Sequence, residues 1–263
     1  MKVKISGDFV VSGGTDTLVC CWRLADGAKT WESKRPAGIV SLSCCSDLVF
    51  SGCLGGSLCC NDLSSGATHW EKGAHTGAVN DVSASPDGKL LVSCSNDCKV
   101  SCWDVEDNGN QQWQAAGHTS WVTKVAVLPK HVVSSSLDKT VCCWSLSDGS
   151  ALWVATHDSA VLKLSVGDGI CCCGTQENKI VCMDLQQGTV QWDADVDEVS
   201  ALDVQEGQIY SGSCDGTLRC FSGNTGKLMW TLQHGAVVTS ICHAGVFSAS
   251  GSADKEVRCW ERR

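Results

Sequence analysis

Apolar and polar side chains alternate along the chain in short segments, and residues 122–156 show the pattern most clearly. Four segments follow one another there, at residues 122–128, 132–136, 141–146 and 152–156, with turn-forming residues between them. A period of two is typical of β-strands that bury one face. The pattern therefore predicts four consecutive strands.

This four-strand pattern repeats along the whole chain. Seven stretches similar to SSSLDKTVCCW align so that each ends at one repeat position, which is occupied by Trp22, Asn61, Trp103, Trp144, Met183, Phe221 and Trp260. These positions lie 38 to 42 residues apart, a period close to that of a four-stranded propeller blade. We therefore expect residues 1–263 to form a single domain of seven repeats.

A glycine and a tryptophan mark the connection between the third and fourth predicted strands of six repeats. The tryptophan always follows four residues after the glycine: Gly27 and Trp31, Gly66 and Trp70, Gly109 and Trp113, Gly149 and Trp153, Gly188 and Trp192, Gly226 and Trp230. Glycine suits the positive-φ position of a tight hairpin, which then fixes the place of the tryptophan on the outer strand. One ring at the same place in each repeat favours packing between blades over stacking on a ligand.

Polar residues and a tryptophan also recur at fixed places. Repeat four contains Gly117-His118, Ser134, Asp138 and Trp144, and repeat three ends with Trp103-Asp104. With these residues the chain resembles the WD-repeat β-propeller family over essentially its whole length. The resemblance implies an all-β fold, a seven-bladed propeller of four-stranded antiparallel blades.

The resemblance further implies a hydrogen-bonded tetrad in which a turn Asp orients a His, the His bonds a Ser, and the Ser reaches an indole N–H. Three repeats carry all four residues: His75, Ser93, Asp97 and Trp103; His118, Ser134, Asp138 and Trp144; His234, Ser250, Asp254 and Trp260. Other repeats depart from the pattern, with Ser12, Asp16 and Trp22 but no His in the first, Gly55 and Asn61 in the second, His157, Cys173, Glu177 and Met183 in the fifth, and Ser211, Asp215 and Phe221 in the sixth. Repeats two and five should be looser or rely on other packing.

Ser, His and Asp together also suggest hydrolase chemistry. A nucleophile needs an exposed oxygen, an oxyanion hole and one cleft, whereas this trio recurs in separate repeats and ends on a buried indole. A polar network that satisfies its own donors is the better interpretation. We predict no catalytic residues.

The seventh repeat supplies three strands rather than four. We expect its last strand to leave an edge on which charged residues discourage unwanted pairing: Glu256, Arg258, Glu261, Arg262 and Arg263. Addition of a partner strand to this edge is a secondary interpretation.

Net charge and hydropathy limit the cellular locations and the classes of binding partner that we expect. A formal net charge of −9 argues against a nucleic-acid partner. The first residues contain no run long enough for a signal peptide, and no stretch approaches the roughly 20 apolar residues of a membrane span. We therefore expect a soluble cytoplasmic protein, with the nucleus also open, that contacts no membrane.

Twenty cysteines raise the question of metal or redox chemistry. Seven of them stand directly before the repeat position: Cys21, Cys60, Cys102, Cys143, Cys182, Cys220 and Cys259. One thiol in each of seven blades cannot converge on one metal, so this position is predicted to be a strand core whose thiols resist labelling. The groups Cys94, Cys98 and Cys102, and Cys171, Cys172, Cys173 and Cys182, lack a complete ligand set. We predict no metal and no cofactor.

Binding of protein or peptide partners is the favoured function. In this family the loops between strands two and three and before strand one resemble the usual partner surface, and Trp121 is the tryptophan outside the two repeated positions. An exposed aromatic side chain can dominate an interface, although its ring could instead fold onto the adjacent loop. The predicted partner residues are Trp121, Arg35, Leu54, Asn96, Leu137, Gln176 and Glu177.

Two other interpretations stay open. The chain could be a propeller enzyme or a small-molecule or cofactor-binding propeller, because the glycine-to-tryptophan spacing also resembles that of quinone-cofactor propellers. It could also be one subunit or module of a larger assembly.

Overall fold

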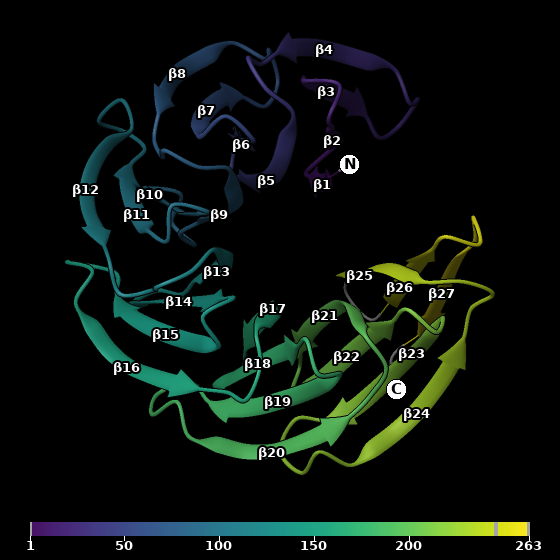
Figure 1. Ribbon diagram of the computed structural model, residues 1–263. Coiled ribbons are helices and arrows are strands. Elements are labelled where there is room, and N and C mark those ends of the chain that lie inside the picture. The colour runs from purple at the N-terminus through teal and green to yellow at the C-terminus, as the bar shows by residue number, and fades with distance from the viewer. Residues whose placement is uncertain (1, 245–246, 262–263) are drawn as a thin grey trace. The chain divides into compact units, whose positions relative to one another are not determined.

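The computed structural model describes residues 2–244 and 247–261, and it folds them into seven antiparallel sheets (Figure 1). Six sheets have four strands and the last has three. The predicted fold class, an all-β seven-bladed propeller with a three-stranded last blade, is confirmed. No helix occurs among the described residues, so none of them forms a helix able to cross a membrane.

The strands run in sequence order within each blade. Blade 1 has β1 Lys2–Ser6, β2 Phe9–Gly13, β3 Leu18–Arg23 and β4 Lys29–Lys34; blade 2 has β5 Ile39–Cys45, β6 Leu48–Cys53, β7 Ser57–Asp62 and β8 Thr68–Gly73; blade 3 has β9 Val79–Ala84, β10 Leu90–Ser95, β11 Val100–Asp104 and β12 Asn110–Ala115; blade 4 has β13 Val122–Val127, β14 His131–Ser136, β15 Thr140–Ser145 and β16 Ala151–Thr156. Blade 5 has β17 Val161–Gly167, β18 Ile170–Thr175, β19 Lys179–Asp184 and β20 Val190–Asp195; blade 6 has β21 Val199–Gln205, β22 Gln208–Ser213, β23 Thr217–Ser222 and β24 Leu228–Gln233; blade 7 has β25 Val238–Ala244, β26 Phe247–Ser252 and β27 Val257–Glu261.

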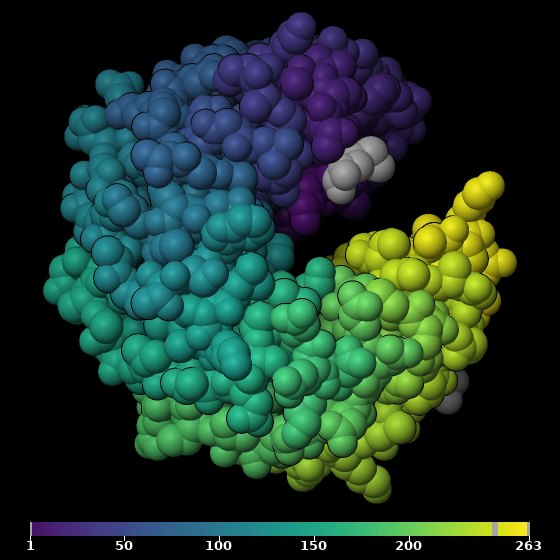
Figure 2. Space-filling view, viewed as in Figure 1, coloured from purple at the N-terminus to yellow at the C-terminus, as the bar shows by residue number. Residues whose placement is uncertain are grey.

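The chain divides into two compact units. Unit 1 comprises residues 1–136 and 142–152, and unit 2 comprises residues 137–141 and 153–263. Within unit 1 the first strands of neighbouring blades pack side by side, β1 against β5, β5 against β9 and β9 against β13 (Figure 1). Figure 2 shows the surface of this unit, with successive segments following one another from purple to teal. Within unit 2, β21 packs in the same way between β17 and β25.

The core lies between successive sheets, where the third strands of blades 2 to 5 each bury four consecutive side chains. In blade 3, Val100 and Cys102 are fully buried, and they join a cluster that includes Val122 and Val132 of the next blade. Apolar surface removed from water between the sheets is the main stabilising contribution. A bulge recurs at the same place between strands three and four, for example between Cys102 and Trp103.

Blade 7 departs from this burial pattern. The cysteine before the repeat position is buried in six blades, as predicted, but Cys259 is exposed, and Val257 beside it is 72% exposed. The prediction that all seven thiols are buried is therefore wrong for Cys259. The alternation of the strand is intact, and Val257 and Cys259, which share one face of β27, are both exposed. Of the predicted edge charges, Arg258 pairs with Glu256 at 3.0 Å, whereas Arg262 and Arg263 lie outside the described residues.

Candidate functional site

The polar network of blade 3 links the loop before β9 to strands β10 and β11. Nδ1 of His75 lies 2.9 Å from Asp97 Oδ2, its Nε2 lies 2.7 Å from Ser93 Oγ, and the Trp103 indole donates to the same Ser93 oxygen at 2.8 Å. Burial lowers the pKa of His75 below its ordinary value of 6.5, although Asp97 opposes that shift. A neutral ring therefore donates from Nδ1 to the carboxylate and accepts the Ser93 hydroxyl at Nε2.

Blade 4 contains the same arrangement around Ser134. Nε2 of His118 lies 2.8 Å from Ser134 Oγ, and the Trp144 indole donates to that oxygen at 2.8 Å. Asp138, which belongs to unit 2, accepts hydrogen bonds from the backbone and the hydroxyl of Thr140 at 2.9 and 2.6 Å. His118, Ser134 and Trp144 are buried inside the blade and bond one another.

Blade 7 lacks the last hydrogen bond of the network. Nδ1 of His234 lies 3.3 Å from Asp254 Oδ2 and its Nε2 lies 2.7 Å from Ser250 Oγ. The buried indole N–H of Trp260 has no hydrogen-bond partner within the described part of the chain, which differs from the expected bond to Ser250. Its ring instead packs edge-on against Trp230, with centroids 5.5 Å apart.

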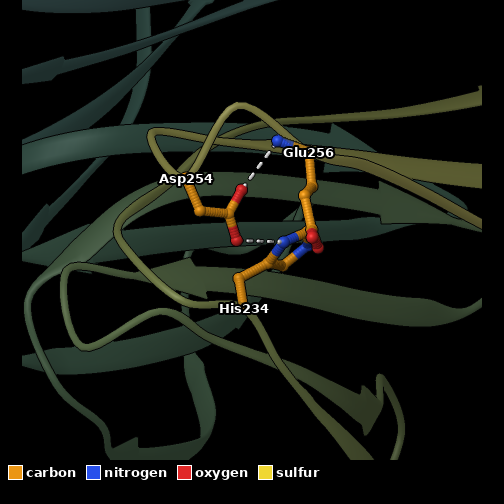
Figure 3. Close-up of side chains that lie close together, drawn as sticks. All are labelled: His234, Asp254 and Glu256. Atoms are coloured by element: carbon orange, nitrogen blue, oxygen red, sulfur yellow. Dashed lines mark hydrogen bonds and ion pairs between the residues drawn. The ribbon is translucent and has the colours of Figure 1, made fainter.

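His234, Asp254 and Glu256 form a cluster with metal-ligand chemistry (Figure 3). One ligand atom from each lies within 4.8 Å of the others. Both nitrogens of His234 are already hydrogen-bonded, and the Glu256 carboxylate pairs with Arg258. In blade 3 the residue matching Glu256 is Lys99, whose backbone N–H bonds Asp97 just as that of Glu256 bonds Asp254. The same pair of His and Asp therefore forms in blade 3 with a lysine at the third position. Hydrogen bonds within the blade explain the cluster without a metal ion.

Arg35 lies elsewhere than the sequence predicted. It was assigned to the exposed partner surface, but only 4% of it is exposed, and it occupies the place of the missing histidine in blade 2. Its guanidinium donates to Asn61 Oδ1 at 2.5 Å and lies 3.4 Å from the Glu71 carboxylate. Arg35 stands four residues before Ile39, as His75 stands four before Val79, and this register was the sequence signal for its burial.

Blade 5 has a small cleft beside His157, where Cys173 and Met183 replace the Ser and Trp of the polar network. Nε2 of His157 lies 3.8 Å from the Cys173 sulfur, and burial lowers the pKa of His157 and raises that of Cys173 to about 12. The cleft holds about 160 Å³ and is lined by His157, Glu177 and Lys179, among others. A thiol with so high a pKa is a poor nucleophile at neutral pH.

Four of the predicted partner residues occupy equivalent turns after the second strand. Leu54, Asn96, Leu137 and Gln176 stand at this position, and Leu54, Asn96 and Gln176 donate their backbone N–H to the loop before strand one at 2.8–3.0 Å. Leu137 and Asn96 are half-buried, whereas Gln176 and the neighbouring Glu177 are exposed. Leu137, Gln176 and Glu177 belong to unit 2, and the others to unit 1.

In unit 1 two large apolar side chains stand out on these loops. Trp121, directly before β13, is 53% exposed, and Leu54 is 51% exposed. The amide of Asn80 donates to Asn96 Oδ1 at 2.6 Å and to the Val122 carbonyl at 2.7 Å, so it ties the Asn96 turn to the loop that carries Trp121. Sequence reasoning missed Asn80, because a single polar residue within a strand carries no repeat signal.

Comparison with known proteins agrees with this architecture. Residues 69–104 and 109–145 match the family model "WD domain, G-beta repeat", and residues 156–252 match the model "Outer membrane protein assembly factor BamB". The F-box/WD repeat-containing protein 9 of Bos taurus is 28% identical over 173 residues, which are 60% of this chain and 38% of that protein. Actin-interacting protein 1 of Drosophila melanogaster is 42% identical over 79 residues, 28% of this chain and 13% of that protein.

A shorter match and a solved structure complete the comparison. WD repeat and SOCS box-containing protein 1 of Homo sapiens is 37% identical over 75 residues, 27% of this chain and 18% of that protein. The crystal structure of the computationally designed Ika8 protein superposes with a TM-score of 0.90 at 24% identity, covering 98% of this chain and 82% of that one. The fold is a seven-bladed β-propeller, and residues 69–104 and 109–145 of it match WD repeats.

Proposed function

We propose that the chain is a non-catalytic scaffold that binds protein or peptide partners on the loops around Trp121. The observation that carries the proposal is the indole of Trp121, which is 53% exposed on a loop at the start of β13. A tryptophan held half in water offers a large rigid contact area, and such side chains supply much of the binding energy of interfaces.

The surroundings of Trp121 support a preformed binding surface. Asn80 fixes the loop to the Asn96 turn by two short hydrogen bonds, so little ordering entropy would be lost on binding. Leu54, on the matching turn of blade 2, adds a second exposed apolar side chain in unit 1. The corresponding turns of unit 2 present Leu137, Gln176 and Glu177, which we assign to the same function.

The buried polar groups support a role without catalysis. The Ser and His side chains of blades 3 and 4 bond one another and an indole, so no hydroxyl there is free to attack a substrate. Burial raises the pKa of Cys102 to about 12 and that of Cys143 to about 11, which leaves these thiols protonated.

The relatives support an adaptor role within a larger assembly. Their names join WD repeats to an F-box or a SOCS box, or describe an interaction with actin. We propose that this chain likewise recruits a protein partner, and we place it in the cytoplasm or nucleus, where its 20 free thiols would stay reduced.

Quantitative affinity capture tests this function. Partners retained by the wild-type chain should be lost from Trp121→Ala but kept by Leu152→Ala, which removes an equally exposed side chain, 51%, from the outer strand of blade 4. An identical set of captured proteins for all three chains would refute the assigned surface.

A small-molecule function has one observation in its favour, the cleft of blade 5. Its lining places His157, Glu177 and Lys179 around about 160 Å³, too small for most cofactors. A metabolite that stabilises the wild-type chain but not Glu177→Ala would favour this second function.

A further inference from the structure

The sequence contains one Asn-Gly pair, and it forms the tip of the hairpin between β11 and β12 in blade 3 (Figure 1). Asn108 and Gly109 both have positive φ, +49° and +65°, and the Asn110 N–H donates to the Asp107 carbonyl at 2.9 Å. These features define a type I′ turn, which Asn-Gly favours. The asparagine is exposed to solvent and the glycine is buried.

This hairpin differs from its counterparts in five other blades. There the glycine N–H donates to the carbonyl four residues earlier at 2.8–2.9 Å: Gly27 to Arg23, Gly66 to Asp62, Gly149 to Ser145, Gly188 to Asp184 and Gly226 to Ser222. The hairpin of blade 3 is one residue longer, and the Gly109 N–H has no hydrogen-bond partner among the described residues. The carboxamide of Asn108 also bonds no group in the described part of the chain. Neither group is therefore held in place by a hydrogen bond.

The nitrogen after an asparagine can attack the carboxamide of that asparagine. At this hairpin the Gly109 nitrogen would form a bond to Cγ of Asn108, and the bond from Cγ to the carboxamide nitrogen would break. The released nitrogen leaves as ammonia and takes the proton that Gly109 loses. Glycine favours this attack because it has no Cβ to hinder the approach.

The attack closes a five-membered imide, which one water molecule then opens. Opening at the bond from Cγ to nitrogen gives aspartate. Opening at the bond from the backbone carbonyl gives isoaspartate, in which the main chain runs through the former side chain. The second product places an additional backbone carbon directly before Gly109.

Gly109 supports a contact between two blades. A Cβ atom on this glycine would lie 2.8 Å from Cδ2 of Trp70, so the ring of Trp70 lies directly on the hairpin tip. The indole N–H of Trp70 donates to the Val105 carbonyl of the same hairpin at 3.4 Å, and only 7% of the residue is exposed. The outer strand of blade 2 is thus coupled to the tip of blade 3.

We propose that Asn108 is a modification site, where reaction with water forms isoaspartate and releases Trp70 from Gly109. The ring contact leaves no room for a longer backbone, and the new carboxylate adds a charge beside an apolar surface. Modification therefore weakens the coupling between blades 2 and 3. The reaction does not depend on partner binding around Trp121.

Incubation of the wild-type chain in neutral buffer at physiological temperature tests the reaction. Peptide mass spectrometry with fragmentation distinguishes asparagine, aspartate and isoaspartate at each position. Asn178 serves as the internal control, because it is also exposed and has a φ of +61°, but a lysine follows it. Asn108 should react at least about tenfold faster than Asn178, because a glycine nitrogen is less hindered. Equal rates, or no isoaspartate at Asn108, would overturn the proposal.

Amide hydrogen exchange tests the release of Trp70. Anion exchange separates the modified chain, which carries an additional negative charge. Exchange in β8, which carries Trp70, should be about tenfold faster in the isoaspartate form than in fresh protein. Exchange in β20 should not change, because its Trp192 lies over the unmodified Gly226. Unchanged exchange in β8 would refute the release.

Two variants separate the backbone change from the charge. Asn108→Gly keeps the positive-φ turn without a carboxamide, so it should form no isoaspartate and keep its β8 protection during the same incubation. Freshly purified Asn108→Asp carries the charge on an ordinary backbone and should also keep its β8 protection. Loss of protection in Asn108→Asp equal to that in the isoaspartate form would assign the effect to charge and overturn the backbone mechanism.

Discussion

Blades 2 and 3 connect the loop before their first strand to their third strand by different chemistry. In blade 3 a neutral His75 reaches Trp103 through Ser93. In blade 2 the longer Arg35 bonds Asn61 directly, and the matching Ser51 hydroxyl is buried without a partner among the described residues. The comparison shows that a buried polar link at this place can be built without histidine.

The two solutions differ in electrostatic cost. The ring of His75 stays neutral because burial lowers its pKa, whereas a guanidinium remains charged even when buried. Blade 2 offsets that cost with the Glu71 carboxylate at 3.4 Å and with an amide that itself bonds the Gly66 carbonyl. Removal of one partner leaves a buried charge only partly compensated. Loss of a partner of Arg35 should therefore destabilise the protein more than loss of a partner of the neutral His75.

The largest effect is expected from Asn61→Leu. This change removes the Oδ1 acceptor and leaves the buried guanidinium of Arg35 with Glu71 alone, which should lower the free energy of unfolding by about 3 kcal/mol. Urea unfolding measures the loss. Asn61→Asp keeps an acceptor and should lose clearly less; equal losses would mean that the hydrogen bond is not the source of the stability.

A smaller effect separates the two serines. Ser93→Ala deprives both His75 and the Trp103 indole of a buried partner and should cost about 2 kcal/mol. Ser51→Ala removes a hydroxyl that bonds nothing in the described structure, and its effect should stay within about 0.5 kcal/mol. Similar unfolding midpoints for the two variants would show that the blade 3 network contributes little.

Acidification should weaken blade 3 before blade 2. The folded pKa of His75 is lowered, so its contribution is complete above 6.5 and is lost as the pH falls from there toward the folded pKa. Asp97, whose pKa is also lowered, loses its contribution only below its ordinary 3.8. Amide protection factors in β11 should therefore fall between pH 7 and 5 more than those in β7, where Arg35 stays charged.

The smallest difference is expected for the thiols at the strand cores. Burial raises the pKa of both Cys60 and Cys102 to about 12, so both should react equally slowly with a thiol reagent under native conditions. The exposed Cys259 should react first and serves as the internal standard. Peptide mass spectrometry can follow each site. Faster labelling of Cys60 than of Cys102 would show that the Arg35–Asn61 link holds blade 2 less tightly than the His75 network holds blade 3.

Strands and hairpins were predictable because they follow from local sequence. The segments expected at residues 122–128 and 152–156 match β13 and β16 to within one residue at each end. Alternation selects the buried face, and the glycine before each outer strand selects the hairpin, so neither depends on distant residues.

The burial of a repeated position was predictable only where the neighbouring blade covers that position in every repeat. Cys259 follows the same alternation as Cys220, yet only Cys220 is covered, because cover comes from residues far away in sequence. Arg35 was taken as a surface residue because it stands in the loop before a first strand, whereas its register with His75 decides its position.

Five outer-strand tryptophans also govern how unfolding can spread, because each donates its indole N–H to a backbone carbonyl of the next blade: Trp31, Trp70, Trp113, Trp153 and Trp192. Each one places the outer strand of a blade in the hydrogen-bonded structure of the next, so the free energy of a blade includes a nearest-neighbour contribution, as in a linear repeat array. Blades 2 to 5 have such a coupling on both sides, and blades 1 and 6 have it on one side only. Opening should therefore begin at the two ends of this row and pass inward one blade at a time.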